Sequence, residues 1–348
     1  MPGGRDGELR REFGCDGLVP HQQRGHDACG PGGITFEPVL GKGADSRCSH
    51  AGARQHRARP WGGSLGGVRP KVAADLPASG EFQQLQDILI GGVTPAGQVP
   101  SVVKLSPPDD EGGGAVEFAF WKMAGDAGIR IPHACLVHDG ERRHFASARF
   151  DRHLRPDGSW GRRHVHTLSG FLHRRTSDGQ IDYEDFIRLA RALGGIGEAR
   201  ECFRRAVFNL LTTNRDDHGR NHAFLYHEAD RTWTLSPAYD LNPNVANVLI
   251  ALTWLGRAEI PTRFDQLTQL AEIGGITPRS AKSIYEEVEA ATLGGWRAVA
   301  ARAGVPENIA GRWEKEMIQQ TKLLREDAHR PSATAKTRVA APKRSPRA

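Results

Sequence analysis

The chain has 348 residues, of which 38% are hydrophobic and 25% are charged, and its formal net charge is +6. A chain of this length can form two lobes or domains with substantial cores. Its start lacks the apolar stretch of a signal peptide, and its longest apolar run, NVLIALTWLG, is about half the length that spans a bilayer. We therefore expect a cytoplasmic protein without a membrane segment, and the positive charge permits an anionic ligand. Free thiols in a reducing compartment are favoured, because five cysteines are scattered without close spacing: Cys15, Cys29, Cys48, Cys135 and Cys202.

Residues 1–60 are rich in glycine, arginine, histidine and proline and show no sustained hydrophobic period. Cys15, His21, His26 and Cys29 have the spacing C-x5-H-x4-H-x2-C, which fits no compact zinc finger. We interpret this part as an irregular N-terminal segment, either disordered or degenerate.

Residues 61–152 have the pattern of a small α+β lobe. SLGGVRPKVAA, QLQDILIGGVTP and VPSVVKLS read as strand pieces, and AVEFAFWKMAGDAGI has the apolar spacing of a helix. HACLVHDG and HFASARFDRH read as two strands joined by an Asp-Gly hairpin turn.

Residues 153–326 are expected to be mainly helical, with one pair of strands in NHAFLYHEADRTWTLSPAYDLNPN. Residues 327–348 form a basic tail rich in proline, serine and alanine, which we expect to be disordered. The predicted fold class is α+β, with a small sheet-rich N-lobe and a larger helical C-lobe. Two such lobes are one way to enclose a nucleotide.

The stretch TTNRDDHGRN carries Asp216 and Asn221 in a D-x-x-x-x-N spacing. In phosphoryl transfer by protein kinases, an Asp at this spacing accepts the proton of the substrate hydroxyl and the Asn holds a metal ion. A turn rich in Asn and Asp that only satisfies its own backbone is the alternative.

Other parts of a phosphoryl-transfer site occur in the order that a kinase requires. Asp240 follows Asn221 by nineteen residues and one predicted hairpin. Lys104 lies on an apolar strand, and Glu117, thirteen residues later, is a candidate ion-pair partner. Each has a plain alternative: a turn-capping Asp, a solvated Lys and a surface Glu.

SLGGVRPK offers Ser64, two glycines, Arg69 and Lys71 in one turn. Backbone N–H groups of such a turn can bind phosphate, and the two cationic side chains can neutralise it. A glycine turn without a ligand is the alternative.

Together these motifs resemble the HipA-like serine/threonine kinases, the toxins of type II toxin–antitoxin pairs. The resemblance covers about residues 61–325 and rests on SLGGVRPK, GGVTPAGQVPSVVKLS, ARFDR, NLLTTNRDDHGRNHAFL and WTLSPAYDLNP, in that order. It implies the two-lobed protein-kinase-like fold, with ATP and Mg²⁺ as cofactors.

The resemblance also implies roles for individual residues. Asp216 would be the catalytic base, Asn221 and Asp240 would bind Mg²⁺, and Ser64 would be an autophosphorylated serine whose modification expels the phosphate loop. The remaining residues would contact ATP: Gly66, Gly67, Val68, Arg69, Pro70 and Lys71 in the phosphate loop, Lys104 at the phosphates, Ala148, Arg149 and Phe150 in the hinge strand along the adenine, and His218, Gly219, Arg220 and Tyr239. The family usually has an acidic residue at the position of Ala148, so adenine would be bound here through the backbone.

The function implied is an ATP-dependent protein kinase that arrests growth, acting on a translation component, typically an aminoacyl-tRNA synthetase. Its partner would be a HipB-like helix-turn-helix antitoxin, with DNA reached only through that partner. A catalytically inactive pseudokinase that binds the antitoxin as a co-repressor is the alternative. The family's usual N-terminal domain is not recognisable in residues 1–60, which favours the alternative, whereas the intact Asp216, Asn221 and Asp240 favour the kinase. A small-molecule kinase is disfavoured by Ser64 and SPAYDLNP.

Overall fold

The computed structural model describes residues 69–89, 93–107, 110, 112–174, 181–244 and 252–328. The chain divides into two compact units, 1–56 and 57–348, and all described residues belong to the second. The expectations for residues 1–60, for Ser64 and residues 66–68, and for the tail after residue 328 lie outside the described residues.

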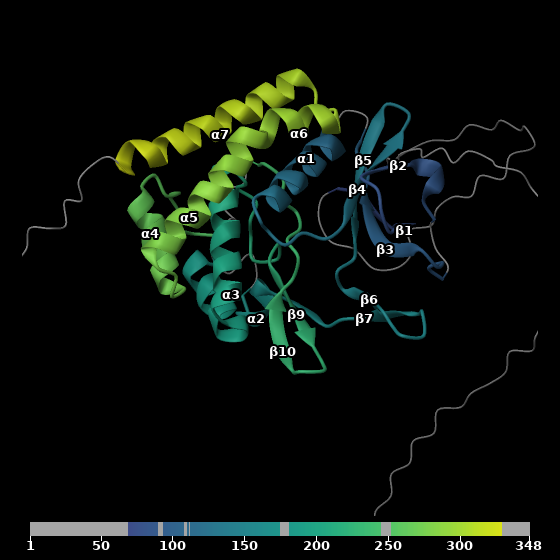
Figure 1. Cartoon of the computed structure of the whole chain (residues 1–348), viewed down its shortest axis with the longest axis horizontal. Coiled ribbons are helices and arrows are strands. Elements are labelled where there is room, and N and C mark those ends of the chain that lie inside the picture. The colour runs from purple at the N-terminus through teal and green to yellow at the C-terminus, as the bar shows by residue number, and fades with distance from the viewer. Residues whose placement is uncertain are drawn as a thin grey trace, which may run out of the picture. The chain divides into compact units, whose positions relative to one another are not determined.

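A five-stranded sheet with the strand order β1-β3-β5-β4-β2 forms the N-lobe (Figure 1). Its neighbours pair antiparallel except β2 and β4, which are parallel. The strands are β1 (Lys71–Pro77), β2 (Phe82–Gln84), β3 (Gln98–Lys104), β4 (Ala134–Asp139) and β5 (Arg142–Ala148). β4 and β5 form the predicted hairpin, in which Gly140 adopts a φ of 60°. The described residues of QLQDILIGGVTP do not form the strand that we expected beyond Gln84, since residues 85–87 form a 3-10 turn and Leu89 makes an isolated bridge to Asp75.

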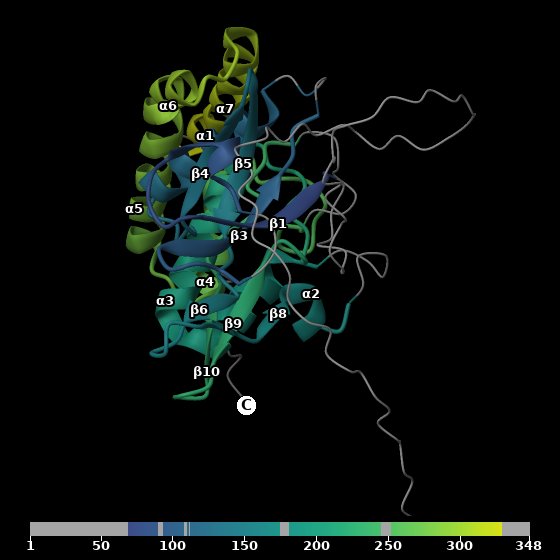
Figure 2. The ribbon, with the colours of Figure 1, turned by 90° about the vertical axis from the view of Figure 1, so that its right-hand side faces the viewer.

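Helix α1 (Gly113–Asp126) follows β3, as its apolar spacing predicts, and packs against β5 and α6. Gly114 permits this close approach, since a Cβ atom there would lie 2.2 Å from the carbonyl oxygen of Arg143. Figures 1 and 2 show α1 between the sheet and the helices of the C-lobe. The approach brings the next turn of α1, which carries Glu117, against the sheet.

The C-lobe contains short strands that periodicity did not predict. Three of them have three residues each: β6 (Arg152–Leu154), β7 (Trp160–Arg162) and β8 (Val165–Thr167). β6 pairs with β7, while β8 joins the predicted hairpin of β9 (Ala223–His227) and β10 (Thr232–Leu235). The expectation that the chain becomes helical directly after residue 152 was therefore wrong for residues 153–167.

Helices form the rest of the C-lobe, as predicted. A non-helical backbone at Gly195, with a φ of 75°, divides α3 into two helical parts. The helices are α2 (Leu168–Phe171), α3 (Tyr183–Leu211), α4 (Phe264–Ile273), α5 (Pro278–Glu289), a π-helical turn (Ala290–Gly294), α6 (Gly295–Ala303) and α7 (Glu307–Ala328). Their apolar faces and α1 share one core, in which Trp296 and Phe208 are fully buried. Within the described part of the chain, no helix is both long and apolar enough to cross a membrane.

Candidate active site

A buried ion-pair cluster joins the two lobes at Lys104. Its ammonium group contacts the carboxylate of Glu117 from α1 and lies 2.7 Å from Oδ1 of Asp240, which follows β10. The Glu117 side chain is 2% exposed and also lies 3.7 Å from Nη1 of Arg69, so two cations balance this buried carboxylate. The spacing had suggested Glu117 as the partner of Lys104, and the structure shows this contact.

The charges in this cluster stabilise one another. Burial acts to lower the pKa of Lys104, but the carboxylates of Glu117 and Asp240 together outweigh it, so the pKa is raised. Burial likewise acts to raise the pKa of Asp240, and the Lys104 ammonium lowers it below its usual value. Lys104 and Asp240 are therefore ionised at neutral pH, a charge arrangement suited to a phosphate ligand and a cation.

Asp216 lies in the loop after α3, and its backbone is held by two neighbours. Its N–H donates to Oδ1 of Asn214 at 3.1 Å, and its carbonyl oxygen accepts from Nδ2 of Asn221 at 2.8 Å. The Asp216 side chain is 35% exposed, and its buried Oδ1 atom lies 3.9 Å from Nε2 of His218. Asp216 is thus fixed by its backbone while its carboxylate remains accessible.

A second layer of buried polar side chains supports this loop. Asn214 donates to Oδ1 of Asn209 at 3.2 Å, and Asn209 donates to the hydroxyl oxygen of Tyr183 at 3.1 Å. The Tyr183 hydroxyl in turn donates to Oδ2 of Asp217. Burial raises the pKa of Asp217 to about 6, with Tyr183 and Arg215 opposing the shift. The loop is therefore connected to α3 at both aspartates. Asp217 accepts directly from Tyr183, and Asp216 is connected through Asn214 to Asn209.

Asp240 follows β10 by five residues, in a loop, and adopts a φ of 58°. The left-handed backbone is unfavourable for most residues, and Asp and Asn tolerate it best. Thr213, directly before the Asp216 loop, has a φ of 55°. The two loops pair through the bridge of Asn214 with Asn244. Left-handed non-glycine residues gather at functional sites when the surrounding structure holds them there.

A cavity of about 840 Å³ opens between the lobes at this cluster. Its lining combines five cationic and four acidic side chains with apolar ones. The predicted site residues that it brings together are Arg69, Lys71, Lys104, Ala148, Arg149, Phe150, Asp216, His218, Arg220, Asn221, Tyr239 and Asp240. Pro70 and Gly219 do not line it. Gly219 instead packs against Ser169, where a Cβ atom would lie 2.6 Å from Oγ, so close packing explains the glycine.

The hinge strand provides the apolar part of the lining. Ala148 and Phe150 face the cavity together with Val102 and Phe145. The N–H groups of Ala148 and Arg149 are already used, because they donate to the carbonyl oxygens of His133 and Pro100 at 2.8 Å.

The side chains of Asn221 and Asp240 fit a magnesium ion. Both line the cavity, and since the Asn221 amide nitrogen donates to Asp216, its oxygen is left as a ligand atom. Mg²⁺ prefers oxygen ligands, and it is usually bound by one or two protein groups together with substrate phosphates. In the described ranges no three acidic, histidine or cysteine side chains form a metal cluster.

A family model described as the HipA-like C-terminal domain matches residues 63–296, or 234 of the 348 residues. The chain belongs to this HipA-like family. A candidate kinase from Haemophilus influenzae is 28% identical to this HipA-like chain over 217 residues. That match spans 55% of the chain and 61% of the relative, so it leaves more than a third of the relative unmatched.

Two solved structures share the fold of this HipA-like chain. One is HipA in a complex with HipB and operator DNA from Shewanella oneidensis, with a TM-score of 0.58 and 17% identity, covering 77% of this chain and 67% of that one. The other is the proinflammatory kinase CtkA of Helicobacter pylori, with a TM-score of 0.52 and 13% identity, covering 78% of this chain and 94% of that one. The fold class predicted from the sequence, a two-lobed kinase-like α+β fold, is thereby confirmed.

Sequence reasoning missed several residues of this HipA-like site. Asp151 lines the cavity and holds Arg149 through two hydrogen bonds of 2.9 and 2.7 Å. Its place in ARFDR is the signal that could have identified it. Arg205 was also missed: it follows Glu201 by four residues and pairs with it, but such a pair in the charged stretch EARECFRR also fits an exposed helix face.

Proposed function

We propose that this HipA-like chain is an ATP-dependent protein serine/threonine kinase that uses Mg²⁺ and acts in the cytoplasm. One observation carries the proposal: Lys104, paired with Glu117 and Asp240, faces the same cavity as Asp216 and Asn221. A phosphate-neutralising lysine, a base and two oxygen ligands are the parts that phosphoryl transfer requires.

Each of these side chains has a definite task in the proposed reaction. Lys104 neutralises phosphate oxygens of ATP, and Asp216 accepts the proton of the substrate hydroxyl. When bound between Asn221 and Asp240, Mg²⁺ would neutralise the charge that develops on the phosphates. Arg69 and Lys71, which begin the described part of the phosphate loop, add positive charge to the same lining.

The biological role proposed is that of a growth-arresting toxin. The family model and the fold shared with a HipA that was solved with HipB and operator DNA support it. The partner proposed is a small helix-turn-helix antitoxin of the HipB type, through which DNA is reached. The substrate class proposed is a translation component, with an aminoacyl-tRNA synthetase as the first to test.

Transfer of labelled phosphate from ATP, in the presence of Mg²⁺, tests the kinase directly. Asp216→Asn should lose at least about a hundredfold in rate, because a positioned general base contributes that much or more. Asp230→Asn, which changes an exposed acid in the β9–β10 turn, is the matched control and should keep full activity. Equal rates in wild type and Asp216→Asn would reject the assignment of the base.

The same measurement separates the kinase from the pseudokinase. Nucleotide binding without any phosphate transfer, to itself or to a translation component, would favour a binding partner that acts as co-repressor. The position of Asp216 argues against that outcome, because its carboxylate is accessible and lies beside the cluster of Lys104 and Asp240.

A further inference from the structure

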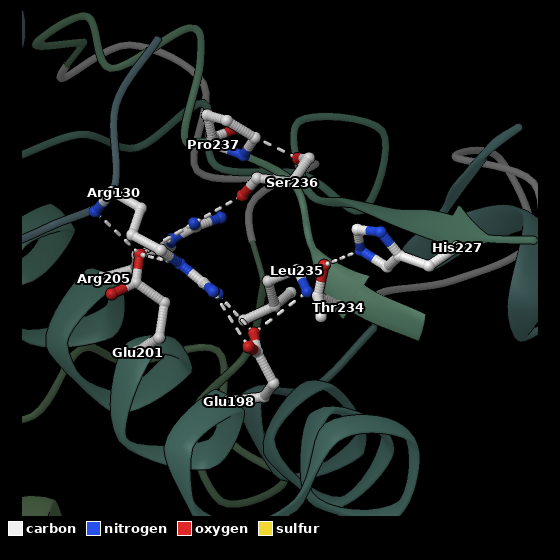
Figure 3. Close-up of polar contacts among 9 residues, drawn as sticks. All are labelled: Arg130, Glu198, Glu201, Arg205, His227, Thr234, Leu235, Ser236 and Pro237. Atoms are coloured by element: carbon white, nitrogen blue, oxygen red, sulfur yellow. Dashed lines mark hydrogen bonds and ion pairs between the residues drawn. The ribbon is translucent and has the colours of Figure 1, made fainter. Parts of the chain in front are cut away.

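Four hydrogen bonds hold the backbone of residues 235–238, directly before Tyr239 and Asp240. They are Leu235 N–H to Oε2 of Glu198 at 2.9 Å, Nη2 of Arg205 to Ser236 O at 2.6 Å, Ser236 N–H to Ala223 O at 2.8 Å, and Ala238 N–H to Arg130 O at 2.7 Å. Figure 3 shows the first two of these contacts and the side chains of α3 that make them. The segment is thus tied to α3 on one side and to the loop after α1 on the other.

Arg205 is the centre of this network. Its side chain is 1% exposed, and its Nε and Nη2 atoms both donate to Oε1 of Glu201 at 2.9 and 2.8 Å (Figure 3). The same Glu201 oxygen accepts from the N–H of Arg130 at 3.1 Å. A buried guanidinium with a fork of donors holds its partners in a fixed geometry.

Arg205 also shares a cavity with the proposed metal ligands. It lines a small cavity of about 10 Å³ together with Asn221 and Asp240. Its Nη1 atom is buried and has no hydrogen-bond partner among the described residues. The volume is about that of one water molecule, so a single water bound to Nη1 would fit between Arg205 and this pair.

We infer that Arg205 is a positioning residue for metal binding: by holding Ser236 and the segment after it, it sets where the Asp240 carboxylate stands relative to Asn221. The inference rests on the proposed function. Three residues separate Ser236 from Asp240, and the hydrogen bond of Ala238 N–H to Arg130 O holds the segment between them, so the position of Ser236 helps to set that of the Asp240 carboxylate. Residues that orient a metal ligand without touching the ion typically change metal affinity by ten- to a hundredfold when removed.

Affinity for Mn²⁺, used in place of Mg²⁺ with a non-hydrolysable ATP analogue, tests the inference without any turnover. Arg205→Met should weaken Mn²⁺ binding about tenfold or more, while affinity for a fluorescent ATP analogue in EDTA stays within about threefold of wild type. Arg204→Met is the matched control, since Arg204 pairs with Glu287 and the carbonyl oxygen of Ala127, each at 2.7 Å, and contacts none of residues 235–240. It should leave Mn²⁺ binding unchanged although it also removes a helix arginine.

Arg205→Lys covers the case in which Arg205→Met does not fold, because lysine keeps a positive charge beside Glu201. Lysine lacks the fork of donors, so we expect the same weakening of Mn²⁺ binding. A folded Arg205 variant with the Mn²⁺ affinity of wild type would overturn the inference and leave the proposed function standing. Absence of nucleotide-dependent Mn²⁺ binding in wild type would instead overturn the proposed function, and the inference with it.

Discussion

Asp217, the buried neighbour of the proposed base, should make the stability of the protein depend on pH in an unusual direction. Its side chain is 5% exposed, and burial raises its pKa from 3.8 to about 6. The folded state therefore binds more protons at this group than the unfolded state does at pH values between these two numbers. Stability contributed by this group is greatest in acid and falls as pH rises through the folded pKa.

The size of the effect follows from the shift. Since one pKa unit corresponds to 1.36 kcal/mol, the full shift amounts to about 3 kcal/mol. Between about pH 4.5 and pH 7.5, where the titration is mostly contained, about 2 kcal/mol of this should be lost. Asp217→Asn cannot titrate, and its amide oxygen can still accept from Tyr183.

Urea unfolding of wild type and Asp217→Asn across this pH range measures the effect. The unfolding free energy of the variant relative to wild type should rise by about 2 kcal/mol from the acidic to the neutral end. The comparison with the variant removes the contribution of His222. Burial lowers the pKa of His222 to about 3, so this residue lowers the unfolding free energy of both proteins as pH falls, and its effect cancels in the difference. Asp230→Asn, at the exposed turn, is the control and should show a constant difference.

A difference between wild type and Asp217→Asn that stays constant within about 0.5 kcal/mol would refute the reasoning. It would mean that Asp217 is ionised without cost in the folded protein. Arg215 is the group that would have to supply the compensation, since it is the cation whose charge opposes the shift.

Three further outcomes are expected. Lys104→Ala should lower nucleotide affinity at least about a hundredfold and unfolding free energy by about 3 kcal/mol, because Glu117 loses its nearer partner and is left with Arg69 at 3.7 Å. Adding Glu117→Gln should restore stability but not binding, and an active Lys104→Ala enzyme would reject the role of the lysine. Mass spectrometry after incubation with Mg-ATP should find phosphate on Ser64. The phosphorylated form should bind ATP poorly, because about two added negative charges would face the carboxylates of the site. Phosphate found elsewhere with Ser64 unmodified would reject this regulation. Deleting residues 329–348 should leave the melting temperature and ATP binding unchanged, and unfolding of the C-lobe would show that the tail is part of it.

Much of the candidate site could be predicted because its parts are local in sequence. Asp216 and Asn221 lie in one loop. The β9–β10 hairpin follows this loop, and Asp240, five residues after the hairpin, lines the same cavity. Lys104 and Glu117 meet because a strand and the helix after it pack together through Gly114. In each case the spacing along the chain already limits the geometry.

The rest could not be predicted, for two physical reasons. β6, β7 and β8 have three residues each, which is too short for an alternation of apolar and polar residues to stand out. The contacts of Arg130 with Glu198 and Glu201 join residues about seventy positions apart, and only the folded chain brings them together. Buried charge looks like a surface helix face in the sequence until its partners are known.

Two independent demands meet at Asp240, and together they explain the residue type. Its backbone is left-handed, which costs an ordinary side chain about 1–2 kcal/mol and is tolerated best by Asn and Asp among non-glycine residues. Its carboxylate must also balance Lys104, which is only 12% exposed and already shares Glu117. Asn would meet the first demand but not the second, and Glu would meet the second but not the first. Asp is the residue that meets both, so the geometry of the backbone and the chemistry of the cavity select the same side chain.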